Sequence, residues 1–221
     1  MTSVRILAFD TATAHCAASL SVDGKATTRI DPMAKGQAEH LLPMLEEMLA
    51  DAGLDWPDLS AIAVGIGPGN FTGIRISVSA ARGIALALGK PAIGVSGLET
   101  VAYGISDAVA CLPAPRGQAY VQSFIPHGDV APRLFDPADP NTWPKLSGRV
   151  TPNFCGPAAE MVANAMGNSA SSPKIHVDMP PVERILRIAA DRLGDEHIER
   201  PVPLYIKPPD AVPMARSVAA P

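Results

Sequence analysis

The sequence predicts an α/β protein in which a mixed or parallel sheet is flanked by helices. Apolar runs of strand length alternate with helical patterns through the first hundred residues. That alternation is typical of a sheet covered by helices. The chain has 221 residues, of which 47% are apolar and 18% charged. It is therefore long enough and apolar enough to bury a sizeable core.

The first thirty residues predict three strands. Residues 4–9 are almost continuously apolar, which is typical of a strand buried on both faces. Residues 15–22 alternate loosely, and the Asp23-Gly24 pair favours a hairpin turn before a third strand over 25–30. These three strands would form one edge of the sheet.

A helix is predicted next, over residues 36–52, because apolar residues recur at helical spacing and Gly53 can end the run. Pro43 lies inside it and should kink it, because proline lacks the backbone N–H. The remaining predicted elements are strands over 61–65, 92–95, 108–112 and 120–125, and helices over 72–88, 98–105, 157–166 and 182–193.

Proline usage changes along the chain. Of the 23 prolines, only Pro32, Pro43, Pro57, Pro68 and Pro91 precede residue 110. We therefore expect an N-terminal subdomain over 1–106 and a smaller, proline-rich subdomain over 107–221, whose tail returns to the first.

Composition excludes several classes of protein. The net charge is −4 and Lys and Arg form no cluster in the sequence, which argues against a broad nucleic-acid footprint. Cys16, Cys111 and Cys155 lie far apart and form no CxxC pair, which favours a reducing compartment. Neither a signal peptide nor a membrane-spanning run is indicated. We expect a soluble, cytoplasmic protein.

The stretch GIGPGNFTGIR, residues 65–75, is the first candidate site. It lacks the lysine of a Walker loop and the last glycine of GxGxxG. It keeps a strand end, close-approach glycines and a helix N-terminus, which can together bind an anion. Arg75 in the first helical turn opposes the helix dipole, so we expect it to meet an anion. The alternative is a tight turn with a structural salt bridge.

The end of the first strand adds a DTxT sequence to this site. It could hold a metal-bound phosphate or water, although a capped turn is the commoner meaning. Together the candidate phosphate-binding residues are Asp10, Thr11, Gly67, Gly69, Asn70, Thr72, Gly73 and Arg75.

The helix over 72–88 is apolar nearly all round, which is typical of a helix buried in its own domain or against a partner. Small residues recur at every fourth position along it, at Gly73, Ser77, Ala81 and Ala85. This ridge would let another helix approach closely. A central core helix and a pairing helix both remain open.

No catalytic or metal-ligating set is predicted. The five histidines are scattered, and His40 has Gly36 and Met44 at the helical spacing where a second ligand would stand. The GVSG stretch ending at Gly97 falls one residue short of the hydrolase elbow GxSxG. Each cysteine is expected to be a small buried hydrophobe.

Taken together, ILAFDTAT, the hairpin, GQAEHLLPMLEEML, the long glycine-loop segment to GVSGLE, and PLYIKPPDA resemble the TsaB (YeaZ) family. This resemblance implies the actin-like ATPase fold of sugar kinases, Hsp70 and actin, with two ribonuclease-H-like subdomains. It also implies a non-catalytic paralogue of TsaD, the subunit that makes threonylcarbamoyladenosine at position 37 of tRNAs reading ANN codons.

The resemblance implies partners as well. The chain would pair with TsaD through the helices over 36–52 and 72–88, with TsaE joining and TsaC supplying the activated threonylcarbamoyl group. Alone it would form a homodimer, tRNA would be contacted only within the complex, and any ATP or ADP would be bound there. The expected interface comprises Leu41, Met44, Met48, Gly73, Ser77, Ala81 and Ala85.

One departure concerns the second subdomain. Most family members have Asp-Ala-Arg where this chain has Ala114-Pro115-Arg116. The missing acid disfavours a phosphate or metal role for the cleft between the subdomains. The glycine loop is then interpreted as the remnant of a phosphate-binding loop, which is kept because it starts the pairing helix at the right angle. Two rival classes stay open, an active ATPase or small-molecule kinase and a glycoprotease-like peptidase.

Overall fold

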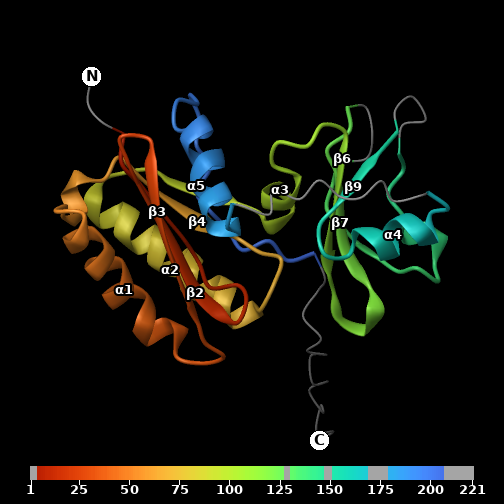
Figure 1. Cartoon of the computed structure of the whole chain (residues 1–221), viewed down its shortest axis with the longest axis horizontal. Helices are drawn as coiled ribbons and strands as arrows, with labels where there is room; N and C mark the ends of the chain where they lie inside the picture. The colour runs from red at the N-terminus through yellow and green to blue at the C-terminus, as the bar shows by residue number, and fades with distance from the viewer. Residues whose placement is uncertain (1–3, 127–129, 147–150, 169–178, 207–221) are drawn as a thin grey trace, which may run out of the picture.

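The computed structural model describes residues 4–126, 130–146, 151–168 and 179–206. Two mixed sheets stand next to each other, each flanked by helices (Figure 1). The α/β class predicted from the alternation of strands and helices is confirmed.

The first sheet has five strands in the order β3-β2-β1-β4-β5. They are β1 (Ile6–Asp10), β2 (His15–Val22), β3 (Lys25–Pro32), β4 (Ala61–Gly65) and β5 (Ala92–Val95). The first three strands pair antiparallel, whereas β4 runs parallel to β1 and β5 runs parallel to β4. The central strands β1 and β4 are buried on both faces, as their continuous apolar runs predict.

Helices cover both faces of this sheet. α1 (Gln37–Asp51) and α2 (Phe71–Leu88) lie on one face, over a core that includes Phe9, Ile62 and Val78. α5 (Pro181–Arg192) covers the other face (Figure 1). α5 therefore packs on the first sheet although it falls within 107–221. The predicted boundary near residue 106 itself stays a prediction.

Two of these helices have unusual features, one in its continuity through a proline and the other in its length and apolar composition. α1 continues through Pro43, because Pro43 and Glu39, whose carbonyl loses its bond, are both exposed to water. α2 is long and apolar enough to cross a membrane by length and composition, with a mean hydropathy of 1.3. Its packing over β4 accounts for the apolar composition of its inner face.

The second sheet has four strands in the order β8-β7-β6-β9. They are β6 (Ala108–Pro113), β7 (Ala119–Ser123), β8 (Arg133–Phe135) and β9 (Asn153–Cys155). β9 runs parallel to β6, so this sheet repeats the order and directions of the first four strands of the other. β8 and β9 are not among the predicted elements, because three residues are too few to show alternation.

Two shorter helices complete the described chain. α3 (Gly97–Ala102) packs against β6 and α5, and α4 (Ala159–Ala165) packs against β6 and β9. Single 3-10 turns span Trp56–Asp58, Pro115–Gly117 and Pro140–Thr142. In Figure 1, α3 lies between the two sheets.

Candidate functional site

The glycine loop joins β4 to α2 at the carboxyl edge of the parallel strands. Its Gly67–Pro68 peptide is cis, and Gly67 has a φ of +95°, which favours glycine. Two neighbouring segments fix the loop: Gly97 donates its N–H to the Gly67 carbonyl at 2.8 Å, and Leu204 donates to the Ile66 carbonyl at 2.8 Å. The loop is therefore held between α3 and the segment that follows α5.

The loop's glycines pack directly against the turn between β1 and β2. A Cβ added at Gly69 would lie 2.5 Å from the Ala12 carbonyl oxygen, and one at Gly73 would overlap the Thr11 carbonyl. No side chain fits at either position without moving that backbone. These glycines therefore allow a close approach between two backbone segments of the same chain.

The polar groups at the start of α2 also bond within the chain. The Asn70 side chain accepts from the Gly73 N–H at 2.9 Å and caps the helix. The Asn70 N–H donates to the Ala12 carbonyl at 2.7 Å, and the Thr11 hydroxyl donates to the Gly73 carbonyl at 2.6 Å. Asp10 Oδ1 accepts from the Ala12 N–H at 3.1 Å. The chain's own turn thus occupies groups that a phosphate would use.

Arg75 does not meet an anion among the described residues. Its guanidinium lies 3.7 Å from the centre of the Phe71 ring, and its Nε donates to the Tyr205 hydroxyl at 3.0 Å. The Phe71 and Tyr205 rings are themselves 5.1 Å apart. Cation–π attraction to Phe71 therefore takes the place of the expected ion pair. The hydrogen bond to Tyr205 and the contact between the two rings tie the segment after α5 to the start of α2. Thr72 is exposed beside this cluster.

The apolar residues of α1 proposed for the partner interface lie in the core. Leu41 is 1% exposed, Met44 0% and Met48 6%. The prediction that these three residues form the partner interface is therefore wrong, because the chain itself covers them. α1 packs against both β2 and α2, so it buries a wider stripe than a helix lying on one element alone.

The small-residue ridge of α2 likewise faces inward. Ser77, Ala81 and Ala85 are buried, and the Ser77 hydroxyl donates to the carbonyl of Gly65 on β4 at 3.3 Å. The prediction that the ridge meets a partner helix is wrong, because its small side chains bring α2 close to β4 and to the turn after β1. The same spacing of small residues suits a close sheet contact as well as a helix contact.

A different set of residues faces outward from these two helices. We call it the outer face of α1 and α2, and it comprises Leu42 and Glu46 on α1 and Ser79, Gly83 and Leu86 on α2. Leu42 is 45% exposed and Leu86 is 75% exposed. Gly83 has nothing within 4 Å of the place of a Cβ, so no contact in the described chain requires glycine there. Each of the two helices thus exposes a large apolar side chain, which a protein contact could cover.

The histidine on α1 takes part in a charged network. His40 Nε2 lies 2.6 Å from Asp31 Oδ2 on β3, and Arg29 contacts Asp31 at 2.9 Å and Glu47 at 2.6 Å. Arg29 and, to a lesser extent, His40 lower the pKa of the Asp31 carboxyl. Within the described ranges no group of three His, Cys, Asp or Glu side chains could hold a metal ion. His127 and His176 lie outside them.

The three cysteines are buried free thiols. Burial raises the pKa of Cys16 to about 11, with a smaller contribution from nearby Asp31, and burial raises that of Cys155 to about 12. Burial also raises the pKa of Cys111. None is activated as a nucleophile, because nucleophilic attack needs the thiolate.

The loop that departs from the family pattern lies between β6 and β7. Arg116 is exposed and has a φ of +62°, a region that favours glycine and costs other residues energy. Ser96, from the GVSG stretch, has a structural role, since its hydroxyl accepts from the Glu99 N–H at 3.1 Å and caps α3.

Comparison of the chain with known proteins indicates its family. The family model described as "TsaD: tRNA N6-adenosine threonylcarbamoyltransferase" matches residues 32–129. The tRNA threonylcarbamoyladenosine biosynthesis protein TsaB of Escherichia coli K12 is 34% identical over 61% of this chain and 63% of its own length. An uncharacterized protein of Mycobacterium tuberculosis H37Rv is 33% identical over 95% of both chains.

The chain belongs to the TsaB (YeaZ) family. Its match to the E. coli TsaB covers less than two thirds of that relative's length. Among solved structures, a Pseudomonas aeruginosa protein described as similar to the peptidase YeaZ superimposes with a TM-score of 0.74, at 24% identity over 92% of this chain and 100% of the other. These neighbours and the two mixed sheets establish the actin-like, ribonuclease-H-like fold of this TsaB-family chain.

Proposed function

We propose that this chain is a non-catalytic subunit in the biosynthesis of threonylcarbamoyladenosine on tRNA, and that it pairs with a TsaD-type transferase. The relatives named TsaB support the pathway. The observation that supports the subunit role is the packing of the β1–β2 turn onto the glycine loop. Because this packing fixes the start of α2, the loop has a structural role. Such a subunit would work in the cytoplasm.

The rival function, an ATPase or kinase, would need the same turn and glycine loop to bind a nucleotide. In the actin-like arrangement, the Asp10 turn and the glycine loop would have to open toward the phosphates and a metal ion. Here Asp10 accepts a hydrogen bond from its own turn, and Asn70 bonds to that turn and to Gly73. Any ATP or ADP is therefore proposed to bind in the complex with TsaD, and the chain alone is proposed not to turn it over.

The outer face of α1 and α2 is the proposed pairing surface. It presents two exposed leucines on helices that lie next to each other on one face of the sheet (Figure 1). Gly83 lies between Ser79 and Leu86 on this surface, where a glycine in mid-helix costs about 1 kcal/mol relative to alanine. A second helix approaching closely at Gly83 would offset that cost. We propose that this surface forms a homodimer in the free protein and exchanges it for TsaD.

Pairing can be tested with two matched substitutions on α2. Gly83→Leu adds volume to the outer face and should weaken co-elution with the TsaD-type partner about fivefold to 150-fold, the effect of about 1–3 kcal/mol of overpacking. Gly83→Ala should leave the chain folded and should weaken pairing less than Gly83→Leu, because it adds a single methyl group. Leu42→Glu tests α1 independently. Normal co-elution of both Gly83→Leu and Leu42→Glu would show that the surface is misassigned.

Activity separates the rival functions. Threonylcarbamoylation of a tRNA transcript by TsaD, TsaE and TsaC should require this chain, and Gly83→Leu should lower it in proportion to lost pairing. ATP turnover by the purified chain that disappears on Asp10→Ala would instead support the ATPase or kinase, and peptide cleavage in the absence of TsaD would support the peptidase.

A further inference from the structure

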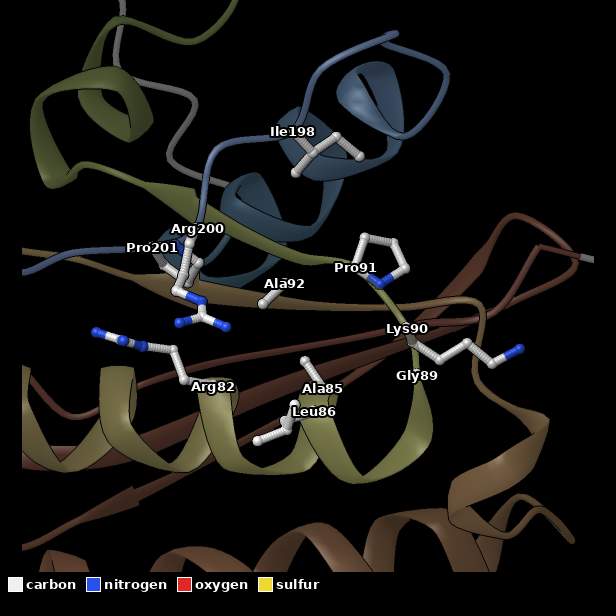
Figure 2. A pocket seen from close by; sticks show the side chains of 10 residues that line it. All are labelled: Arg82, Ala85, Leu86, Gly89, Lys90, Pro91, Ala92, Ile198, Arg200 and Pro201. Atoms are coloured by element: carbon white, nitrogen blue, oxygen red, sulfur yellow. The ribbon is translucent and has the colours of Figure 1, made fainter.

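A cleft of about 290 Å³ lies between the C-terminal half of α2 and the segment that follows α5. Its apolar lining includes Ala85, Ala92 and Ile198, while Arg82, Lys90 and Arg200 line it with positive charge. Figure 2 shows Arg82 rising from α2 and Arg200 coming down from the opposite segment, so that both enter the same space. Lys90 stands toward the other end of the cleft. We call these three residues the basic cleft residues.

The two arginines of the cleft differ from four other arginines of the described chain. Arg5, Arg29, Arg187 and Arg192 each form an ion pair with a carboxylate. Within residues 4–126, 130–146, 151–168 and 179–206, Arg82 and Arg200 make no such pair. Among the residues that the structure describes, no acidic residue lines the cleft. Arg82 and Arg200 enter the same space, so their like charges repel each other, and a bound anion would relieve that repulsion.

Helix electrostatics explain only part of this cluster. Lys90 follows the C-terminus of α2, where a cation is favoured by the helix dipole. Arg200 comes from a separate segment beyond α5, and the chain as a whole carries a charge of −4. The cleft is thus a local concentration of positive charge on an acidic protein, with contributions from two distant parts of the sequence.

We propose that the basic cleft residues bind phosphate groups of an RNA backbone, which rests on the proposed role in tRNA modification. Guanidinium groups match phosphate oxygens in bidentate geometry, and the lysine ammonium binds phosphate as a point charge. Arg82 and Arg200 lie toward one end of the cleft and Lys90 toward the other, so the cleft offers positive charge to anions at more than one position (Figure 2). A phosphodiester chain repeats its charge in this way, whereas a single carboxylate from a protein partner reaches one end only.

The test compares Arg82→Gln/Arg200→Gln with the wild-type chain, alone and in complex with the TsaD-type partner. Binding of a fluorescent tRNA transcript is measured between 50 and 200 mM salt. The double variant should bind on the order of tenfold more weakly at 0.1 M salt, and the slope of log K against log salt should fall by about 2. Arg116→Gln, an exposed arginine beside the second sheet, is the matched control and should change neither. Lys90→Gln should lower the slope by about 1.

Three other outcomes overturn the proposal, and a fourth separates it from the proposed subunit role. Unchanged tRNA binding by the double variant contradicts it. Lost co-elution with TsaD and unchanged tRNA binding would assign the cleft to an acidic protein segment. Inorganic phosphate that binds through Arg82 and Arg200 without competing with tRNA would assign it to a small free anion. If the wild-type chain does not pair with TsaD but the double variant still loses tRNA, the proposed subunit role fails and the cleft assignment stands.

Discussion

Gly73 shows how a single atom decides the role of the glycine loop. A Cβ there would overlap the Thr11 carbonyl, while at Gly83, ten residues along the same helix, it would meet open space. The two glycines therefore have opposite reasons to be glycine. The first serves contact within the chain, and the second lies where we propose that a partner approaches.

We predict opposite stability effects for alanine at these two positions. Gly73→Ala should lower the free energy of unfolding by about 1–3 kcal/mol, because it overpacks α2 against the turn after β1. Gly83→Ala should raise it by up to about 1 kcal/mol, because alanine has the higher helix propensity. Urea unfolding of both variants checks this. Equal effects at the two sites would contradict the assignment of Gly73 to a close backbone contact.

At the scale of elements, the edge strand β3 is joined to α1 by the network around Asp31. The carboxyl of Asp31 on β3 meets Arg29 on the same strand and His40 on α1, and Arg29 also reaches Glu47 on α1. The side chains of this network are partly exposed to solvent. They are expected to hold the edge strand against the helix.

This network predicts a dependence of stability on pH. The folded state lowers the pKa of Asp31 below its ordinary value, so the stabilisation is fully present above that ordinary pKa and is lost as the pH falls through the folded pKa. Asp31→Asn should cost about 1 kcal/mol or less at pH 7, because the groups are partly solvent-screened.

The measurement is urea unfolding between pH 6 and pH 2. The wild type should lose more free energy of unfolding over the acid end of this range than Asp31→Asn does. Asp51→Asn, an exposed carboxylate at the end of α1, is the control. Parallel pH profiles for wild type and Asp31→Asn would rule out a stabilising role for this carboxyl.

At the scale of the whole molecule, α5 connects the end of the described chain to its beginning. Ile185, Leu186 and Ala189 pack on the face of the first sheet that holds Ile6 and Ala8. The segment beyond α5 then runs back to the glycine loop through Leu204 and Tyr205. The first sheet is thus covered on one face by a helix from the far end of the sequence.

A chain ending at residue 178 should therefore not form a stable first sheet. Removing α5 exposes a continuous apolar face of that sheet, and exposed patches of this size promote aggregation. Solubility and urea unfolding of the truncated chain, compared with a chain ending at residue 206, test this. Cooperative unfolding with unchanged stability in the shorter chain would show that α5 does not stabilise the first sheet.

Much of this fold follows from local sequence. The strands at His15–Val22, Ala61–Gly65 and Ala92–Val95 have the predicted bounds, because each is a short apolar or alternating run between strong turn signals. The start of α2 at the glycine loop was also predictable, since Asn70 is a good helix cap. Local propensity and turn chemistry suffice for such elements.

What the sequence by itself could not determine is which side of each element faces inward. The apolar stripe of α1 and the small-residue ridge of α2 suit a partner and a core equally well, because hydrophobic spacing is the same for both. Only the tertiary structure showed that the stripe and the ridge face the chain's own sheet, and that Arg82 and Arg200 line one cleft from distant segments. The physical reason is that burial and charge clustering depend on contacts between segments far apart in the chain, which no local pattern records.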